Sequence, residues 1–315
     1  MNSRPLRWSA ALLLAAAACH ARPVDPAATH PLPPVVISEL PPGAASVRFF
    51  ALGDAGTGRS GQREVAAAMA SKARRDGCAF VLLLGDNFYP HGVASADDPL
   101  FERDFEDVYD GKWLAVPFFA ALGNHDHAGS IDGEIERTTR GTRWCMPDRH
   151  YQFRWLLEDG VALDFFAIDT TPIVEGDDAD REEVRWLEAA LSRSSARWKV
   201  VFGHHPIRSV APRPELDRLA EQVEPLFRRH GVDLYLSGHH HCLEMFPPRD
   251  GLACVVSGAG GGRDNAGVVE WTDDVEYAAT GGGFVAVRAS RDELLLEFVR
   301  TDSTTQFART LQKRR

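Results

Sequence analysis

Five short clusters of polar residues stand out in this sequence, because each follows an apolar stretch typical of a buried strand. They offer carboxylate, amide and imidazole groups, and a glycine directly precedes each one, which lets the chain turn sharply there. The clusters are Asp54, Asp86, Asn124 with His125, His204, and His239 with His241. Oxygen and nitrogen donors without thiolates suit first-row metals such as iron, zinc or manganese.

The apolar stretches before these clusters predict strands, and the segments between them predict helices. Apolar residues recur at helical spacing within 63–75, 101–108, 180–191 and 216–223. Three later stretches, at 252–260, 282–290 and 293–300, predict a more antiparallel arrangement of strands. In open α/β sheets ligands bind outside the carboxyl ends of the strands, where all five clusters fall. We therefore expect one α/β domain, roughly residues 46–310.

Taken one at a time, the clusters have ordinary explanations as turns, helix caps or structural histidines. Taken together, they contain more candidate ligands than one tetrahedral metal site needs. Two metals about 3.5–4 Å apart could share a carboxylate and clamp the attacking and leaving oxygens of an in-line displacement. Hydrolysis of a phosphate ester suits such a site, because its transition state needs charge neutralisation and positioning.

The ordered motifs "GDAG", "GDNFY", "GNHDH", "VFGHH" and "GHHH" resemble those of the calcineurin-like metallophosphoesterases. Tyr89, three residues after Asp86, narrows the resemblance to the purple acid phosphatases. Further stretches are similar to the small, tartrate-resistant type: "FEDVYDG", "VPFFAALGNHDHAG", "RWCMPDRHYQF", "FFAIDTT" and "VVSGAGGG". The resemblance covers about residues 47–300. It implies an α/β fold, a four-layer αββα sandwich with a dinuclear metal centre at one edge.

The resemblance also implies a role for each polar residue. The ligands of a ferric ion would be Asp54, Tyr89 and His241. Those of a second metal, which would be Fe(II), Zn(II) or Mn(II), would be Asn124, His204 and His239. Asp86 would bridge the metals, and His125 would help to bind phosphate or protonate the leaving group. The implied enzyme is an acid phosphatase that hydrolyses phosphate monoesters by in-line attack of a metal-bound hydroxide.

One position departs from the mammalian members, which have a histidine nine residues after the ligand at His204, where this chain has Arg213. Arg208 and Arg213 could instead bind a phosphate oxygen, with solvated loop arginines as the alternative. Two other functions stay open: a phosphodiesterase on the same metal core, and a lipoprotein that captures metal or phosphate without turnover. A histidine such as His125 argues against capture, which needs no proton donor.

The first residues form a different kind of segment. Arg4 and Arg7 precede the apolar stretch Ala10–Ala18, which is too short to span a bilayer and is typical of a secretory signal. The small residues that end at Cys19 resemble a bacterial lipoprotein signal, so residues 1–18 are expected to be removed and Cys19 lipidated. Ordinary cleavage at a nearby small residue is the alternative. Residues 19–45, rich in proline and alanine, predict an extended tether.

These features predict export to the bacterial periplasm, or to the outer membrane or cell surface as a lipoprotein. The formal net charge of −10 and the absence of a long basic run argue against nucleic acid or an anionic membrane surface as a partner of the body of the protein. Small phosphorylated substrates are the expected partners, and a lipid at Cys19 would be the one membrane contact.

Export also permits disulfides among the four remaining cysteines. Cys242 and Cys254 flank a segment whose Pro-Pro and Asp-Gly pairs predict a reversing loop. We therefore expect these two residues to form a disulfide across neighbouring strands, with free buried thiols as the alternative.

Overall fold

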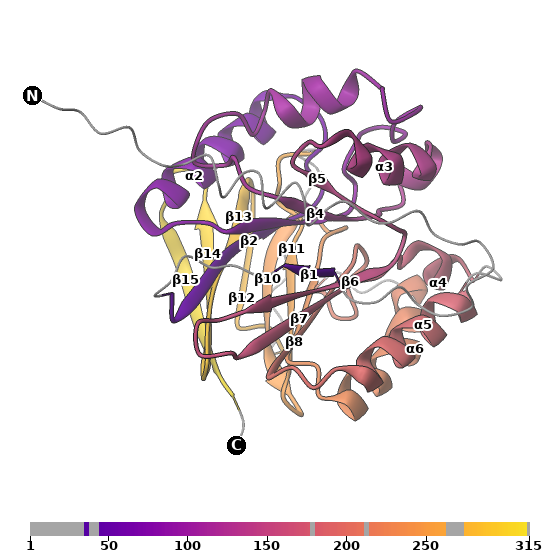
Figure 1. Cartoon of the computed structure of the whole chain (residues 1–315), viewed down its shortest axis with the longest axis vertical. Coiled ribbons are helices and arrows are strands. Elements are labelled where there is room, and N and C mark those ends of the chain that lie inside the picture. The colour runs from indigo at the N-terminus through magenta and orange to yellow at the C-terminus, as the bar shows by residue number, and fades with distance from the viewer. Residues whose placement is uncertain (1–34, 38–43, 177–179, 211–213, 263–273, 314–315) are drawn as a thin grey trace, which may run out of the picture.

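The computed structural model describes residues 35–37, 44–176, 180–210, 214–262 and 274–313. Two β-sheets lie face to face, and helices cover the outer face of each sheet (Figure 1). The predicted α/β class and the four-layer αββα sandwich in one domain are therefore confirmed. Within the described residues, no helix has the length and apolar character needed to cross a membrane.

The first sheet has seven strands in the order β15-β14-β13-β2-β3-β4-β5. Its parallel strands are β2 (Ser46–Leu52), β3 (Phe80–Leu84), β4 (Phe118–Ala121) and β5 (Trp144–Cys145). Its antiparallel strands are β13 (Gly283–Ser290), β14 (Glu293–Arg300) and β15 (Thr305–Gln312). The helices on its outer side are α2 (Ser60–Asp76), against β13 and β14, and α3 (Ile131–Arg137), against β5. This sheet supplies three of the five predicted clusters.

The second sheet has eight strands in the order β1-β6-β7-β8-β9-β11-β10-β12. Its parallel run consists of β7 (Ala162–Ala167), β8 (Trp198–Phe202), β9 (Leu234–Ser237) and β11 (Leu252–Ser257). Its antiparallel strands are β6 (Tyr151–Leu156), β10 (Cys242–Arg249) and β12 (Tyr277–Thr280). The helices over it are α4 (Thr171–Glu175), α5 (Asp180–Arg193) and α6 (Pro214–His230). The two remaining clusters follow β8 and β9.

The main core lies between the sheets and is rich in aromatic rings. Phe80 on β3 is fully buried and stacks on Phe49 with ring centroids 5.0 Å apart. Its edge contacts Phe119, Phe153 and Phe165, which come from both sheets. Strands buried on both faces need uninterrupted apolar runs, which explains why Phe80–Leu84 does not alternate with polar residues.

Three details differ from the sequence-based expectations. The apolar residues of 101–108 form only a short π-helical segment, η1 (Phe101–Glu106). Part of the predicted tether is in the sheet, because β1 (Val35–Ile37) pairs in parallel with β6 and forms the edge of the second sheet. The predicted Cys242–Cys254 disulfide is wrong. The two strands do pair, but Cys254 lies opposite Phe246, and both thiols are free.

Replacing Phe80 with alanine should lower the free energy of unfolding by about 3 to 5 kcal/mol, because it leaves a cavity where several rings meet. Equilibrium denaturation in urea measures this change. The control is Trp113→Ala, at a side chain that is 39% exposed, which should change stability by only about 0.5 kcal/mol. Equal effects of the two substitutions would show that Phe80 is not central to the core.

Candidate metal centre

The carboxyl ends of β2, β3 and β4 in one sheet meet those of β8 and β9 in the other at a single edge of the sandwich. Backbone hydrogen bonds join the ends of neighbouring strands. Asp54 N donates to Gly85 O (3.0 Å), and Gly238 N donates to His204 O (2.8 Å). The ring of His204 crosses between the sheets, where its Nδ1 lies 3.0 Å from Leu84 O. The predicted clusters are therefore brought to one place.

One group of donors surrounds the hydroxyl of Tyr89. Its oxygen lies 2.9 Å from Asp86 Oδ2, 3.4 Å from Asp54 Oδ1 and 3.2 Å from His241 Nε2. The same His241 nitrogen is 3.4 Å from Asp54 Oδ1. Four donor atoms of the types that ferric iron accepts thus converge on one point, at three buried residues and the partly exposed His241.

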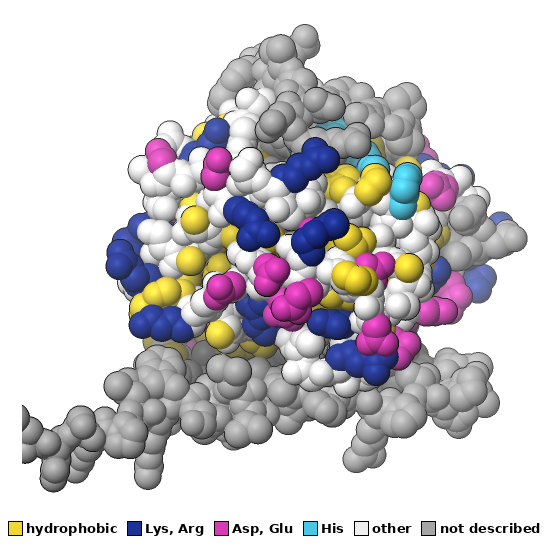
Figure 2. Space-filling model, turned by 90° about the horizontal axis from the view of Figure 1, so that it is seen from above, with side chains coloured by type: hydrophobic (Ala, Val, Ile, Leu, Met, Phe, Trp, Pro, Cys, Tyr) yellow, Lys and Arg dark blue, Asp and Glu magenta, His cyan; other side chains and the backbone are white. Residues whose placement is uncertain are grey.

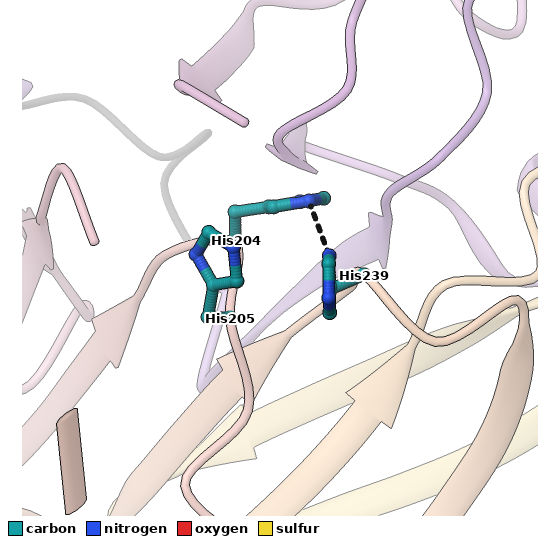
Figure 3. Close-up of side chains that lie close together, drawn as sticks. All are labelled: His204, His205 and His239. Atoms are coloured by element: carbon teal, nitrogen blue, oxygen red, sulfur yellow. Dashed lines mark hydrogen bonds between the residues drawn. The ribbon is translucent and has the colours of Figure 1, made fainter. Parts of the chain in front are cut away.

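A second group of donors surrounds Nε2 of His204. This nitrogen lies 3.1 Å from Asn124 Oδ1, 3.4 Å from Asp86 Oδ1 and 3.2 Å from His239 Nδ1. Figure 3 shows the last of these contacts, between the rings of His204 and His239. An amide oxygen, a carboxylate oxygen and two imidazole nitrogens again converge, and this set suits a divalent first-row metal.

Asp86 belongs to both groups. Its Oδ2 faces Tyr89, and its Oδ1 faces His204. Its carboxylate also accepts a hydrogen bond from the backbone N–H of His125 (3.0 Å), which fixes its orientation. A carboxylate that presents one oxygen to each of two donor sets has the geometry of a bridging ligand.

The electrostatics of these groups favour bound cations. Burial raises the pKa of Tyr89, and the carboxylates of Asp54 and Asp86 raise it further. Burial also raises the pKa of Asp54, although His241 and His204 oppose this. Within the described part of the chain, the ion pairs of Asp54 and Asp86 are all with histidines. Buried acids without a lysine or arginine partner are the surroundings in which positive ions are stabilising.

His125 lies next to the donors without joining either group. Its Nδ1 is 2.6 Å from the carbonyl oxygen of Pro90, so this nitrogen carries a proton, and Nε2 faces the site at 3.9 Å from Asp86 Oδ2. The ring packs against Tyr89 with centroids 4.6 Å apart, and the side chain stays 33% exposed. This position gives His125 access both to the donors and to solvent.

The loops that carry the donors are held in sparsely populated conformations. Asp54, Asp86 and His239 all have positive φ, at 57°, 53° and 66°. Gly85 has φ 84°, and a Cβ there would come within 2.7 Å of the Nδ1 atom of His204. Backbone strain of this kind persists only where the surrounding structure enforces it, and it concentrates at functional sites.

Asp126 supplies part of that enforcement, a role that the sequence analysis missed. Its carboxylate accepts hydrogen bonds from the backbone N–H groups of Asn87 (2.9 Å), Phe88 (3.1 Å) and Gly123 (2.8 Å). It thereby joins the loop after β3 to the loop after β4. Burial, together with Asp86, raises the pKa of Asp126 to about 7. The sequence signal for this role was the position of Asp126 inside "GNHDH". An aspartate that only forms a turn at this position would give the same sequence.

His205 is a second residue that the sequence analysis did not assign. It is buried, its Nδ1 lies 2.9 Å from Thr170 Oγ1, and its ring centroid is 4.5 Å from that of His239. His204, His205 and His239 together offer nitrogens close enough to hold a metal (Figure 3). The stretch "GHH", residues 203–205, predicted a polar strand end, but the sequence did not show which of its two histidine rings faces the centre.

Of the two arginines considered for phosphate binding, Arg208 is not brought to this centre. Arg208 lies 2.5 Å from Glu224 on α6 and so engages the helix layer. Arg213 lies outside the described residues. The other candidate residues all lie at this edge of the sandwich, in or beside the two groups of donors. The structure does not itself test which metal each would bind.

Comparisons with known proteins agree with this geometry. The family model of the calcineurin-like phosphoesterases matches residues 47–243. Purple acid phosphatase 4 of Arabidopsis thaliana is 30% identical over 83% of this chain and 82% of its own length. Tartrate-resistant acid phosphatase type 5 of Homo sapiens is 29% identical over 89% of this chain and 95% of its own length.

Solved structures support the fold alone, since their identities are below 25%. GAP50, described as the anchor in the inner membrane complex of Plasmodium, has a TM-score of 0.76 and 24% identity over 86% of this chain and 90% of its own. A purple acid phosphatase from Lupinus luteus has a TM-score of 0.65 and 18% identity over 88% of this chain and 55% of its own. The predicted family is confirmed: the chain belongs to the calcineurin-like phosphoesterases, among the purple acid phosphatases.

Proposed function

We propose that this protein is an exported acid phosphatase that hydrolyses phosphate monoesters at a dinuclear metal centre. The observation that carries the proposal is the carboxylate of Asp86, whose two oxygens face two separate sets of donors. A single metal would leave one of these sets without a cation. Similarity to acid phosphatases over most of the chain supports the choice of phosphate monoesters as substrates.

Each set of donors suits a different ion. Asp54, Tyr89 and His241 would hold ferric iron, since a phenol with a raised pKa loses its proton only to a strongly acidic cation. The second set would hold Fe(II), Zn(II) or Mn(II) and consists of Asn124, His204 and His239. When bound, the two cations would neutralise phosphoryl charge and supply hydroxide at acidic to neutral pH.

His125 would bind a phosphate oxygen and protonate the leaving group. Pro90 O accepts a hydrogen bond from Nδ1–H, which leaves Nε2 as the nitrogen that meets the substrate. In the imidazolium form, Nε2 carries a second proton, so from there it can donate a hydrogen bond to a phosphate oxygen and give that proton to the departing oxygen, which lowers the barrier for poor leaving groups. This position also favours turnover over capture, because a protein that only stores metal or phosphate gains nothing from a proton donor beside the ligands.

Export is the second part of the proposal, and the sequence supports it. The apolar stretch Ala10–Ala18 and the cysteine that follows it lie outside the described residues. Removal of residues 1–18 and lipidation of Cys19 would place the catalytic domain at the periplasmic face of a membrane or at the cell surface, on the tether that begins there.

Replacing Asp86 with alanine should remove bound metal and turnover together, because both donor sets lose an oxygen. Metal analysis and the turnover of phenyl phosphate measure the two effects. In a separate assay, the wild type should hydrolyse phenyl phosphate faster than bis(4-nitrophenyl) phosphate, because the proposed substrates are monoesters. The control Asp97→Ala removes a carboxylate that is 75% exposed and paired with Arg140, and should keep both properties. Full metal occupancy without Asp86 contradicts the bridge, and faster diester turnover contradicts the monoester assignment.

Replacing His125 with alanine should lower turnover by about 10²-fold while the metal content stays the same, since general acid–base help is of that order. The loss should be larger for an alkyl phosphate than for 4-nitrophenyl phosphate, whose leaving group needs little protonation. His230→Ala, at the end of α6, serves as the matched histidine control. Unchanged turnover of the alkyl phosphate would exclude the acid role.

Replacing Tyr89 with phenylalanine should abolish a purple to pink colour in the iron-loaded protein while the fold is kept. The colour is expected from charge transfer between the phenolate and ferric iron, and the substitution removes only the oxygen. Absorption spectra of the iron-loaded proteins provide the measurement. Tyr277→Phe, at the edge of the second sheet, should keep the band. A band that survives in the Tyr89 variant would show that this residue only packs.

A further inference from the structure

The motif "FFAIDTT" ends in polar residues that belong to neither group of donors. Asp169 and Thr170 closely follow β7, and both are fully buried. Figure 2 shows histidine side chains on an outer face of the molecule. Asp169 and Thr170, in contrast, have no exposure to solvent, so they cannot meet a substrate and can act only through the parts of the chain that they contact.

Asp169 holds the loop that follows β4 in the first sheet. Both of its carboxylate oxygens lie 2.9 Å from Nε2 of His127, and an ionised carboxylate can only accept, so the Nε2–H group is the donor. The guanidinium of Arg149 lies 3.9 Å from Asp169 Oδ2, which is too long for a hydrogen bond. His127 comes three residues after Asn124 in the chain. Asp169 therefore fixes the loop that supplies Asn124.

Thr170 holds the loop that follows β8 in the second sheet. Its Oγ1 accepts a hydrogen bond from the backbone N–H of His205 (3.0 Å) and lies 2.9 Å from Nδ1 of the same residue. Its methyl group packs on the same loop, where a Cβ on Gly203 would come within 2.8 Å of Thr170 Cγ2. The donor His204 stands between these two contacts in the chain, and its ring lies beside that of His205 (Figure 3). Thr170 therefore contacts the loop on both sides of a donor.

Two successive residues at one strand end thus join the two loops whose donors meet in the second group. Asn124 Oδ1 and His204 Nε2 lie 3.1 Å apart, although their loops follow strands of different sheets. A metal binds more tightly to donors that are already in place, because binding then has fewer groups to order. The contacts of Asp169 and Thr170 are therefore suited to support this metal site.

The first group of donors is not held in this way. Its members come from the loops after β2, β3 and β9, at Asp54, Asp86 with Tyr89, and His241. In the described part of the chain, the hydrogen bonds of the Asp169 and Thr170 side chains reach no residue of these three loops. A change at Asp169 or Thr170 should therefore act on one metal site and spare the other.

We propose that Asp169 and Thr170 are positioning residues for the second metal. By holding the loops that supply Asn124 and His204, they set the affinity of this site for its divalent ion and leave the affinity of the ferric site unchanged. The proposal rests on the dinuclear centre of the proposed function. Residues that orient metal ligands typically contribute about 10- to 100-fold in metal affinity, which gives the size of the expected effect.

The test measures the affinity of the iron-loaded protein for Zn(II) by competition with a chelator. Thr170→Val keeps the volume of the side chain and its packing on Gly203 but removes Oγ1, and it should raise the Kd for Zn(II) by about tenfold or more. Thr170→Ser restores the oxygen and should recover most of the affinity. The matched control is Thr171→Val, which should leave the Kd unchanged. Thr171 is also buried, but its Oγ1 has no hydrogen-bond partner among the described residues.

Asp169→Asn should also raise the Kd for Zn(II), because it removes the charge and one of the two oxygens that bind His127. Its control is Asp164→Asn, near the start of the same strand, where a buried carboxylate pairs with Arg154 at 2.6 Å. This control should lower the midpoint of urea denaturation and leave the Kd unchanged. In the Asp169 and Thr170 variants, the iron content and the visible band of the ferric site should match those of the wild type.

Wild-type affinity for Zn(II) in both Thr170→Val and Asp169→Asn overturns the proposal, even though the dinuclear centre stands. An equal loss of iron and zinc also overturns it, as does a loss in Asp164→Asn as large as that in Asp169→Asn, because either result would show general destabilisation. A Thr170→Ser protein as weak as Thr170→Val excludes the oxygen as the positioning group. A wild type that binds iron but no second metal is a different result, which contradicts the proposed dinuclear centre itself.

Discussion

Negative charge buried at one edge of the sandwich is the constraint on which the rest of this structure depends. The carboxylates of Asp54 and Asp86 are almost completely buried, and the hydroxyl of Tyr89 lies between them. Taking one unpaired ion out of water costs several kcal/mol even in a relaxed protein. Histidines are the recorded ion-pair partners of these acids in the described residues, so bound cations must supply the remaining compensation. Metal binding and stability of this edge are therefore linked.

Such a site can exist only on a scaffold that holds its loops in place without metal. The two sheets provide this scaffold, because buried strands from both of them end at the same edge and the aromatic core fixes their separation. Asp126 then joins the loops after β3 and β4 through three backbone N–H groups, and His204 joins the two sheets through Leu84 O. These bonds offset the strain of Asp54, Asp86 and His239, each of which has positive φ.

The sequence was enough to predict that these polar residues gather at one edge, because each stands at the end of an apolar strand and strand ends of this fold meet. It was not enough to predict contacts that depend on register or side-chain direction. Cys242 and Cys254 lie on paired strands, yet the register sets Cys254 opposite Phe246. Arg208 follows a ligand in the chain but turns to Glu224 on the helix layer. Asp126 looks like an ordinary turn residue until the loops it joins are seen together.

The choice of substrate has to come from outside the metal centre. The same donors serve monoesters with any leaving group, since they meet only the transferred phosphoryl group and the oxygens on either side of it. The formal net charge of the chain is −10, so an anionic leaving group meets repulsion from the body of the protein. The residues around the donors, and not the metals, therefore decide which esters fit.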